Sequence, residues 1–540
     1  MKYKVTFSIV LCTLLWLPGL NAQDASFYMK YANKGDKDAM CKLADCYYRG
    51  DGGVEQNLSM ALNWYESAAK KGSVEGQFMA AYCYFYGLGT SEDFLIHGLG
   101  YLNKALKKEY VPAYWLSAQN WKTYKQYSAY YLSNIKKAAE GNYGPGQSEY
   151  GLLYLYGSPD YGISQDIQTG VTWLQKSADN EDAMGMYYLG ICYDHGTGVA
   201  MDHSKATEYY VQSAQLGYPE AQVWAGYAYL TGDCVDIDYS KAYHYFNIAA
   251  GQSNGFAYGK LGDMYYYGLG LEENNNTALD MYKAAANLGD AYSMCQLAYM
   301  YGNGIGSSED NDLMYKYYRQ AADLDYAPGQ CGVGDCYMNG YGVAQDTYCA
   351  YLWYKKAAEQ DNPSALYRLA YCYRDGIGGS KDISKFIEAL EKSANLDYTA
   401  AKAALGYEYY IGANIPGGAN LVKSLRWLKE AAKDDDVYAE SMLGYCYYTG
   451  TELFSQKDYE QAFTYLSQAV ANDNFNYLED VIKASVFRSL AGCYRYGRGC
   501  EADQSLASYY TELSAKYGDE GSQRAAGLLR RDLDESSTIH

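Results

Sequence analysis

The feature that most constrains the fold is a phrase that recurs along the chain: Tyr, two residues, Gly, one residue and usually a second Gly. Seven successive copies are separated by six intervals of 36 residues, and their first glycines are Gly196, Gly232, Gly268, Gly304, Gly340, Gly376 and Gly412. Self-similarity with a period of about 20–50 residues indicates stacked units. Such an array lengthens along one line, so a chain of 540 residues needs no single oversized core.

Further copies of the phrase extend the array in both directions, with first glycines at Gly50, Gly87, Gly157, Gly450 and Gly497. The gap of 70 residues between Gly87 and Gly157 leaves room for one degenerate unit at 111–142. The interval from Gly450 to Gly497 is eleven residues too long, which predicts an insertion near 472–483. The sequence therefore predicts about thirteen units.

Each unit is predicted to form two helices. The first ends at the Tyr of the phrase, here called the signature Tyr, and a Leu-Gly or Leu-Ala pair such as Leu189-Gly190 begins four residues before it. Residues four apart share a helix face, and the small residue lets a neighbouring helix come close. The Gly after the signature Tyr suits a left-handed C-cap. An Asp often ends the following loop and is predicted to be the N-cap of the second helix, as at Asp202, Asp238, Asp346, Asp382 and Asp503.

These motifs together resemble a known family. The Leu-Gly-x-x-Tyr core is similar to the tetratricopeptide pattern. The Tyr-x-x-Gly-x-Gly-Val loop, the Lys205-Ala206 pair and the Trp-Tyr-x-x-Ala-Ala second helix, as at Trp64-Tyr65, resemble the Sel-one-like repeat family over roughly residues 24–531. The resemblance implies an all-α fold, an α/α superhelical solenoid of about thirteen tetratricopeptide-like helical pairs. It also implies an adaptor or scaffold role, and it carries no catalytic residues over.

The two ends of the chain are expected to differ from the array. Residues 1–22 have the order of a signal peptide, with Lys2 and Lys4, an apolar run at 5–17 and a small residue, Ala22, for cleavage. The protein is therefore expected to be secreted or periplasmic, and no later stretch is apolar enough to span a bilayer. The remaining boundaries are a partial repeat or cap at 23–37, the solenoid at 38–518, a capping helix at 519–531 and a disordered tail at 532–540.

Charge and motifs exclude several classes of function. The net charge of −20 repels phosphate backbones and anionic lipid, which argues against nucleic acid and membrane-surface partners.

The segment Gly251-Gln252-Ser253-Asn254-Gly255 matches the nucleophile-elbow pattern. That pattern needs a strand before the Ser, and here it falls on a turn between helices. The sequence predicts no catalytic residues, no cofactor and no metal site, and hence not an enzyme but a binder of a protein or peptide partner.

Cysteine recurs at one slot, directly before the signature Tyr. A repeated slot beside a core Tyr predicts a small buried hydrophobe, and equivalent slots in neighbouring units are expected about 8–10 Å apart, too far for a disulfide. The seven residues of this slot are Cys46, Cys83, Cys192, Cys336, Cys372, Cys446 and Cys493.

In solenoids of the resembled superfamily the first helix lines the concave surface, and the slots two residues before and one after the signature Tyr would point there. Tyr suits such a surface because it offers rigid apolar area with a polar tip. Whether these rings bind a partner or pack between helices stays open, and a glycan or cell-wall ligand is the alternative to a protein. With Leu230, the candidates are Tyr82, Phe85, Tyr227, Tyr266, Tyr299, Tyr371, Tyr407, Tyr410, Tyr445 and Tyr448, and the acids at equivalent slots are Asp45, Asp194, Asp263 and Asp335.

Overall fold

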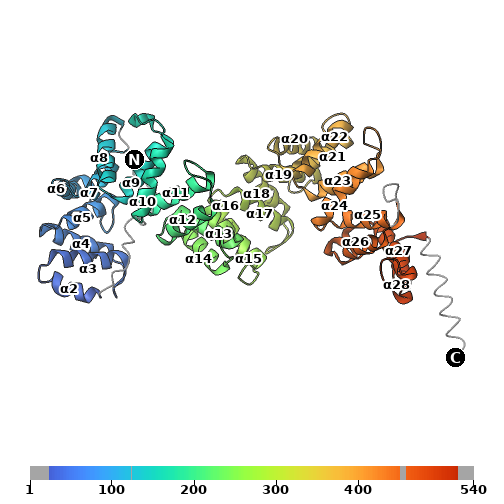
Figure 1. The fold of residues 1–540 in the computed structure, drawn as a ribbon, viewed down its shortest axis with the longest axis horizontal. Helices are drawn as coiled ribbons and strands as arrows, with labels where there is room; N and C mark the ends of the chain where they lie inside the picture. Colours follow the sequence, from blue (N-terminus) through green and yellow to red (C-terminus); the bar gives the residue numbers. More distant parts are fainter. Residues whose placement is uncertain (1–23, 123–124, 451–457, 521–540) are drawn as a thin grey trace, which may run out of the picture. The chain divides into compact units, whose positions relative to one another are not determined.

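The structure is a computed structural model that describes residues 24–122, 125–450 and 458–520. These residues form 27 α-helices and no β-strand, which confirms the predicted all-α solenoid of helical pairs. The chain divides after Gly289 into two compact bodies. The first holds α2–α16 and the second α17–α28, as Figure 1 labels them.

Thirteen helical pairs lie within the described residues, in agreement with the predicted number, and α2 (Ala25–Ala32) precedes them. The first helices are α3 (Lys37–Arg49), α5 (Val74–Tyr86), α7 (Val111–Trp121), α9 (Gly144–Tyr156), α11 (Ala183–His195), α13 (Pro219–Thr231), α15 (Gly255–Tyr267), α17 (Ala291–Gly302), α19 (Ala327–Asn339), α21 (Pro363–Asp375), α23 (Thr399–Ile411), α25 (Val437–Thr449) and α27 (Asp480–Tyr496). The second helices are α4 (Leu58–Lys70), α6 (Leu99–Leu106), α8 (Ser128–Glu140), α10 (Ile167–Asp179), α12 (His203–Gln215), α14 (Tyr239–Gly251), α16 (Asn275–Asn287), α18 (Asn311–Asp323), α20 (Thr347–Ala358), α22 (Ile383–Asn395), α24 (Leu421–Lys433), α26 (Tyr459–Ala471) and α28 (Gln504–Lys516).

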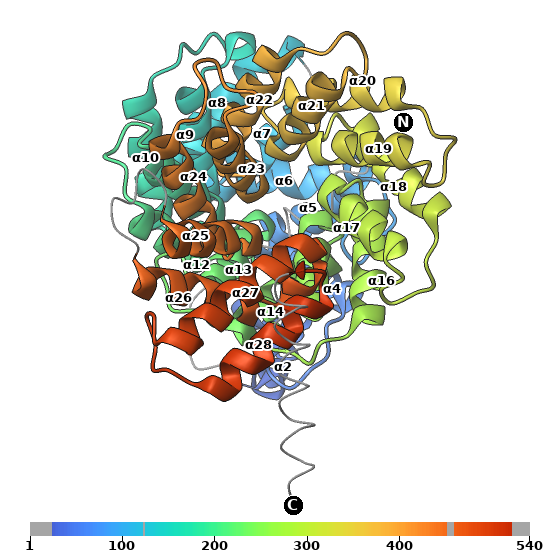
Figure 2. The same cartoon turned by 90° about the vertical axis from the view of Figure 1, so that its right-hand side faces the viewer.

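Each first helix packs against the second helix of its own unit, as α27 and α28 do in red in Figure 2. The predicted caps start the second helices. The Asp202 carboxylate accepts the Lys205 N–H at 3.1 Å, and Asp382 accepts the Lys385 N–H at 3.0 Å. Equivalent bonds are made by the other three predicted residues, Asp238, Asp346 and Asp503. All five predicted N-caps are therefore confirmed.

The abundance of Tyr has a structural cause in ring pairs within several units. The signature Tyr301 stacks on Tyr317 of the second helix with centroids 5.8 Å apart and planes 1° from parallel. Tyr494 and Tyr510 repeat this at 5.7 Å and 4°. In several units the Lys three residues after the N-cap Asp also covers the signature ring, as Lys241 does 4.7 Å from the centroid of Tyr229. Offset stacking and cation–π contact hold the two helices of a unit together.

Two glycines of the motif are needed for close packing. A Cβ on Gly334 would lie 2.5 Å from the ring of Tyr354 in the second helix, which confirms the predicted close approach after the Leu slot. The second Gly of the phrase has a different role. Gly342 has a φ of +63°, and a Cβ there would overlap the backbone of Asn311, where the preceding unit's second helix begins. The Gly-x-Gly loop therefore stacks one unit on the next.

The cysteine slot is buried as predicted in all seven units. Burial raises the pKa of the Cys83 thiol to about 12 and that of Cys192 to about 11. These thiols therefore stay protonated and act as small core side chains.

The two regions where the spacing predicts a departure from the repeat, 111–142 and 472–483, are irregular in different ways. In the first, α7 and α8 occupy the segment 111–142, after a short π-helix, η1 (Phe94–Gly98), and the eight-residue α6. A 3-10 turn, η2 (Lys125–Tyr127), precedes α8, and another, η3 (Pro159–Tyr161), follows α9.

In the second region the extra residues form a 3-10 turn, η4 (Asp473–Tyr477), and extend α27 to 17 residues. The ring of Phe475 packs 5.2 Å from that of Phe487. The predicted signal peptide at 1–22, the tail at 532–540 and all but the first two residues of the capping helix at 519–531 lie outside the described residues.

Candidate functional site

The candidate surface is one face of the first helices, here called the first-helix face: the slots nine, five and two residues before each signature Tyr. These slots share a face because their spacing is i, i+4 and i+7. In α13 they hold Glu220, Trp224 and Tyr227, and in α15 they hold Phe256, Lys260 and Asp263.

The predicted residues differ widely in exposure. Tyr227, Tyr299 and Tyr407 are exposed by 37, 48 and 38%. Tyr82 is wrong as a surface candidate, because it is fully buried. Its ring packs 4.7 Å from Tyr86 and 6.1 Å from Phe78, so it belongs to the core of the first body. The other candidates are half-buried, namely Phe85, Tyr266, Tyr371, Tyr410, Tyr445 and Tyr448.

Two of the half-buried rings are held by contacts within the solenoid. Arg498 donates a hydrogen bond to the Tyr448 hydroxyl at 3.3 Å, and a Cβ on Gly492 would collide with that hydroxyl. Tyr371 lies edge-on to Phe386 at 5.8 Å, and the Arg374 guanidinium covers it at 4.4 Å. Packing is therefore the main role of these two rings in the structure.

A run of exposed aromatic side chains lies on α13 and α15 of the first body. Trp224 is 45% exposed and its ring centroid is 6.5 Å from that of Tyr227, which is 6.4 Å from Phe256. Phe256 is itself 41% exposed.

Sequence reasoning found Tyr227 but missed Trp224 and Phe256. The missed signal was helical spacing, because Trp224 precedes Tyr227 by three residues and lies on the same face.

The acids predicted on this surface have partners inside the solenoid. Asp263 accepts a hydrogen bond from the Tyr282 hydroxyl at 2.7 Å, and Asp335 accepts one from Tyr354 at 2.7 Å. Asp45 and Tyr65 repeat the pair at 2.7 Å. In each case the Tyr belongs to the second helix of the same unit, so the acid joins the two helices and does not face a partner unpaired.

Two of the acids have further partners. Asp194 lies 2.7 Å from the His203 imidazole. Burial raises the pKa of Asp335, although the guanidinium of Arg368, from the next unit, lies 2.7 Å from its carboxylate and opposes the shift.

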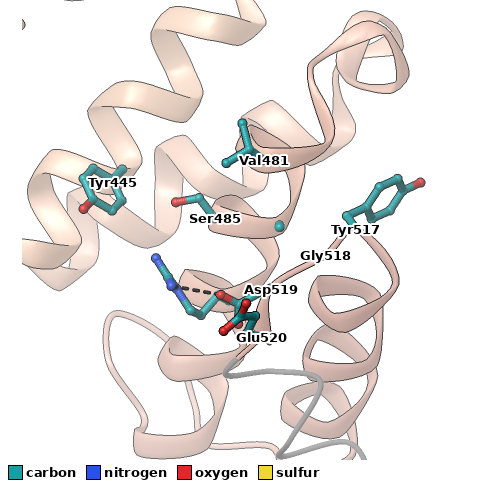
Figure 3. A pocket seen from close by; sticks show the side chains of 9 residues that line it. Tyr445, Val481, Ser485, Tyr517, Gly518, Asp519 and Glu520 are labelled. Carbon is teal, nitrogen blue, oxygen red and sulfur yellow. Dashed lines mark hydrogen bonds and ion pairs between the residues drawn. The ribbon is translucent and has the colours of Figure 1, made fainter.

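Tyr445 fronts a recess in the second body, shown in Figure 3. The recess has a volume of about 470 Å³, and α27 contributes Val481, Ser485 and Arg488 to its wall. Arg488 donates to Asp519 at 3.0 Å, the contact drawn as a dashed line in Figure 3. The half-buried ring of Tyr445 and the guanidinium of Arg488, which is paired with Asp519, therefore line the same recess.

The residues considered for chemistry fall at structural positions. Ser253 lies in the turn between α14 and α15 with a φ of +64°, as predicted for a turn between helices. Within 24–122, 125–450 and 458–520, no group of three or more His, Cys, Asp or Glu is placed to hold a metal ion. In the same ranges none of the helices is both long and apolar enough to cross a membrane.

Comparison with known families identifies the repeat. Twelve stretches match the family model described as the Sel1 repeat, at 37–73, 74–110, 144–182, 183–218, 219–254, 256–290, 291–326, 327–362, 363–398, 399–436, 437–474 and 489–519. The chain belongs to the Sel1 repeat family. The family model leaves out residues 111–143, where α7 and α8 nevertheless form a helical pair. Sel1 repeat proteins generally mediate protein–protein interaction and are typically non-catalytic.

Several relatives and solved structures are similar to the chain. The crystal structure of c5321, a protective antigen of uropathogenic Escherichia coli, is 26% identical, with a TM-score of 0.50 over 88% of this chain and 94% of that one. A putative sel1-like repeat-containing protein of Acanthamoeba polyphaga mimivirus is 30% identical over 16% of each chain. The rat (Rattus norvegicus) DAP3-binding cell death enhancer 1 is 32% identical over 17% of each chain. The matched segments thus span less than a fifth of these curated relatives.

Proposed function

We propose that the protein is an exported, non-catalytic scaffold that binds a partner protein along the first-helix face. The observation that carries this proposal is the run of exposed rings formed by Trp224, Tyr227 and Phe256. Other repeated aromatic slots place their rings against a neighbouring helix, as Tyr65 and Tyr282 do at full burial. Exposed contiguous rings on a rigid scaffold are typical of protein interfaces.

The second body supports the same proposal with fewer rings. Tyr299 on α17 and Tyr407 on α23 are both more than one-third exposed. The ring of Tyr407 lies 5.9 Å from that of Tyr438 on α25, so the face carries a smaller aromatic pair there. An aromatic ring immobilised by its neighbours loses little entropy when a partner binds.

Export is part of the proposal and rests on the order of Lys2, Lys4, the apolar run and Ala22. The intact mass of the mature protein tests it. A chain that begins at Gln23 supports export, and a mature product that retains residues 1–22 contradicts it.

The binding proposal is tested by capture of partner proteins from a native cell-envelope extract. The chain should retain a protein that is lost when Tyr227→Ala and Tyr407→Ala are combined. Tyr348→Ala is the matched control, because Tyr348 is 58% exposed but lies on a second helix. A partner retained equally by all three proteins contradicts the proposal. Competition by free cell-wall sugars would favour the glycan alternative.

The non-catalytic part of the proposal has a separate test. Because Ser253 lies in an inter-helix turn, Ser253→Ala should leave folding and partner capture unchanged. A hydrolytic activity that is present in the native chain and lost in this variant would contradict the proposal.

A further inference from the structure

The aromatic run on α13 and α15 has a defined anchor at one end. Trp224 stacks on Tyr210 of α12 with centroids 5.7 Å apart and planes 20° from parallel. Its exposed 45% therefore lies at the side and edges away from Tyr210. The indole is held rigidly and presents a flat electron-rich surface, which is the preferred aromatic partner of a cation.

An acid with one carboxylate oxygen that lacks a hydrogen-bond donor shares the helix face of this indole. Glu220 precedes Trp224 by four residues and so shares its helix face. In the part of the chain that the structure describes, the Oε2 atom of Glu220 is buried and has no hydrogen-bond donor. Burial raises the pKa of Tyr188 and Tyr218, and the nearby Glu220 charge raises both further. The carboxylate thus lies among phenols, and Lys122, the cation that also acts on Tyr188, is paired with Glu149 at 2.6 Å.

The lysines of this region are already paired. Residues 183–267 contain eight acidic residues and three lysines. Lys205 lies 3.9 Å from Asp202, and Lys241 lies 3.2 Å from Asp238. Lys260 lies 2.7 Å from Asp263 and 5.3 Å from the ring centroid of Phe256, so its charge is compensated beside the aromatic run. The region therefore keeps an excess of negative charge.

We propose that this part of the first-helix face, formed by Glu220, Trp224, Tyr227 and Phe256, binds an extended, lysine- or arginine-bearing segment of a partner protein. A side-chain cation of the segment lies between the Glu220 carboxylate and the Trp224 ring, and apolar groups of the segment cover Tyr227 and Phe256. The acidic surroundings attract a basic chain and repel phosphate-bearing ligands. This inference rests on the proposed function and specifies the chemistry of the partner.

The test measures fluorescence anisotropy of a labelled decapeptide of alternating lysine and valine. The unmodified chain should bind this peptide, bind it more weakly in about 0.5 M salt, where charges are screened beyond about 4 Å, and not bind the glutamate–valine analogue. Trp224→Ala should weaken binding by about tenfold or more, and Tyr348→Ala should not change it. Glu220→Gln, which keeps the side-chain shape, should weaken binding and reduce its salt dependence. Trp224→Phe retains a ring and serves as the folding check through its melting temperature.

Three outcomes of the peptide measurements overturn the inference: no binding of the lysine peptide, equal binding of the glutamate peptide, or unchanged binding by Glu220→Gln and Trp224→Ala. A glucosamine oligosaccharide that binds in a Trp224-dependent way while the lysine peptide does not would also overturn it. The capture experiment distinguishes a failure of this inference from a failure of the proposed function. If the envelope partner is retained by Glu220→Gln and Trp224→Ala but lost on Tyr227→Ala with Tyr407→Ala, only the inference is wrong.

Discussion

The first-helix face of the first body differs between two regions. It is covered at α5 and α9, here called the closed region, and it exposes aromatic rings within residues 183–267, here called the open region. Glu149 on α9 and Trp224 on α13 occupy the same slot, five residues before the signature residues Tyr154 and Tyr229. Glu149 is 7% exposed, whereas Trp224 is 45% exposed. The same contrast separates Tyr82 from Tyr227 at the slot two residues before the signature Tyr.

At Glu149 the first-helix face is covered by the degenerate unit. The Glu149 carboxylate accepts hydrogen bonds from Trp115 at 3.2 Å, Tyr131 at 2.8 Å and Lys122 at 2.6 Å. Gln119 donates to it as well. All four donors belong to α7, α8 or the residue after α7, which depart from the motif. Glu149 and Trp224 share a slot but differ in exposure. The slot in the repeat is therefore not enough to predict whether a side chain is exposed for binding, because a neighbouring unit can cover it.

The largest effect is expected from Tyr82→Ala. This substitution removes a fully buried ring, and large-to-small changes in a core cost about 3–5 kcal/mol. Tyr227→Ala, at the equivalent slot, should change stability by less than about 1 kcal/mol, because its ring is partly in water. Chemical denaturation of both variants measures the difference. Equal losses would remove the distinction between the two regions.

A smaller loss is expected from Glu149→Gln. The amide keeps the shape of the side chain but leaves Lys122 without its 2.6 Å ion pair, and loss of a partly buried charged hydrogen bond costs about 2–3 kcal/mol. Glu140→Gln is the control, since Glu140 is 56% exposed and makes an i,i+4 pair with Lys136 at 3.6 Å. A melting temperature equal to that of the control would show that the polar network does not hold the closed region.

Removal of one hydroxyl in the open region should have a still smaller effect. Tyr282→Phe deletes the 2.7 Å bond to Asp263, and this bond is worth about 1–2 kcal/mol because the acid is buried. Tyr509→Phe, at a 55% exposed ring, is the control. Peptide binding to Trp224 should be unchanged in both. A loss of binding without a loss of stability would mean that the Asp–Tyr pair belongs to the binding surface.

The alkylation rates of the cysteines compare the core packing of the closed and open regions without any substitution. Burial raises the pKa of Cys83 in the closed region to about 12 and that of Cys192 in the open region to about 11. Both should resist alkylation in the native protein at neutral pH, because the thiolate is the reactive form. The exposed Cys234 should react first. Native labelling of Cys192 as fast as Cys234 would show that the open region loses its core packing as well.

Much of the fold could be predicted because it is specified locally. The period, the N-cap role of Asp202 and the burial of Cys192 depend on residues within one unit, so a repeated motif reveals them. The partners of Glu149 lie on α7, on α8 or directly after α7, in a unit whose sequence departs from the motif. The burial of Tyr82 beside Phe78 and Tyr86 follows from side-chain packing that its slot in the repeat does not reveal. Trp224 and Phe256 were missed because they lie outside the two slots considered, although helical spacing connects Trp224 to Tyr227.

The central claim is that the open part of the first-helix face binds a partner. The most direct measurement is the affinity of the captured partner for Trp224→Ala and Tyr227→Ala, made alongside the melting temperature of each variant. The account predicts an affinity about tenfold or more weaker at a nearly unchanged melting temperature. Unchanged affinity, or a loss that follows a large fall in melting temperature, would contradict it.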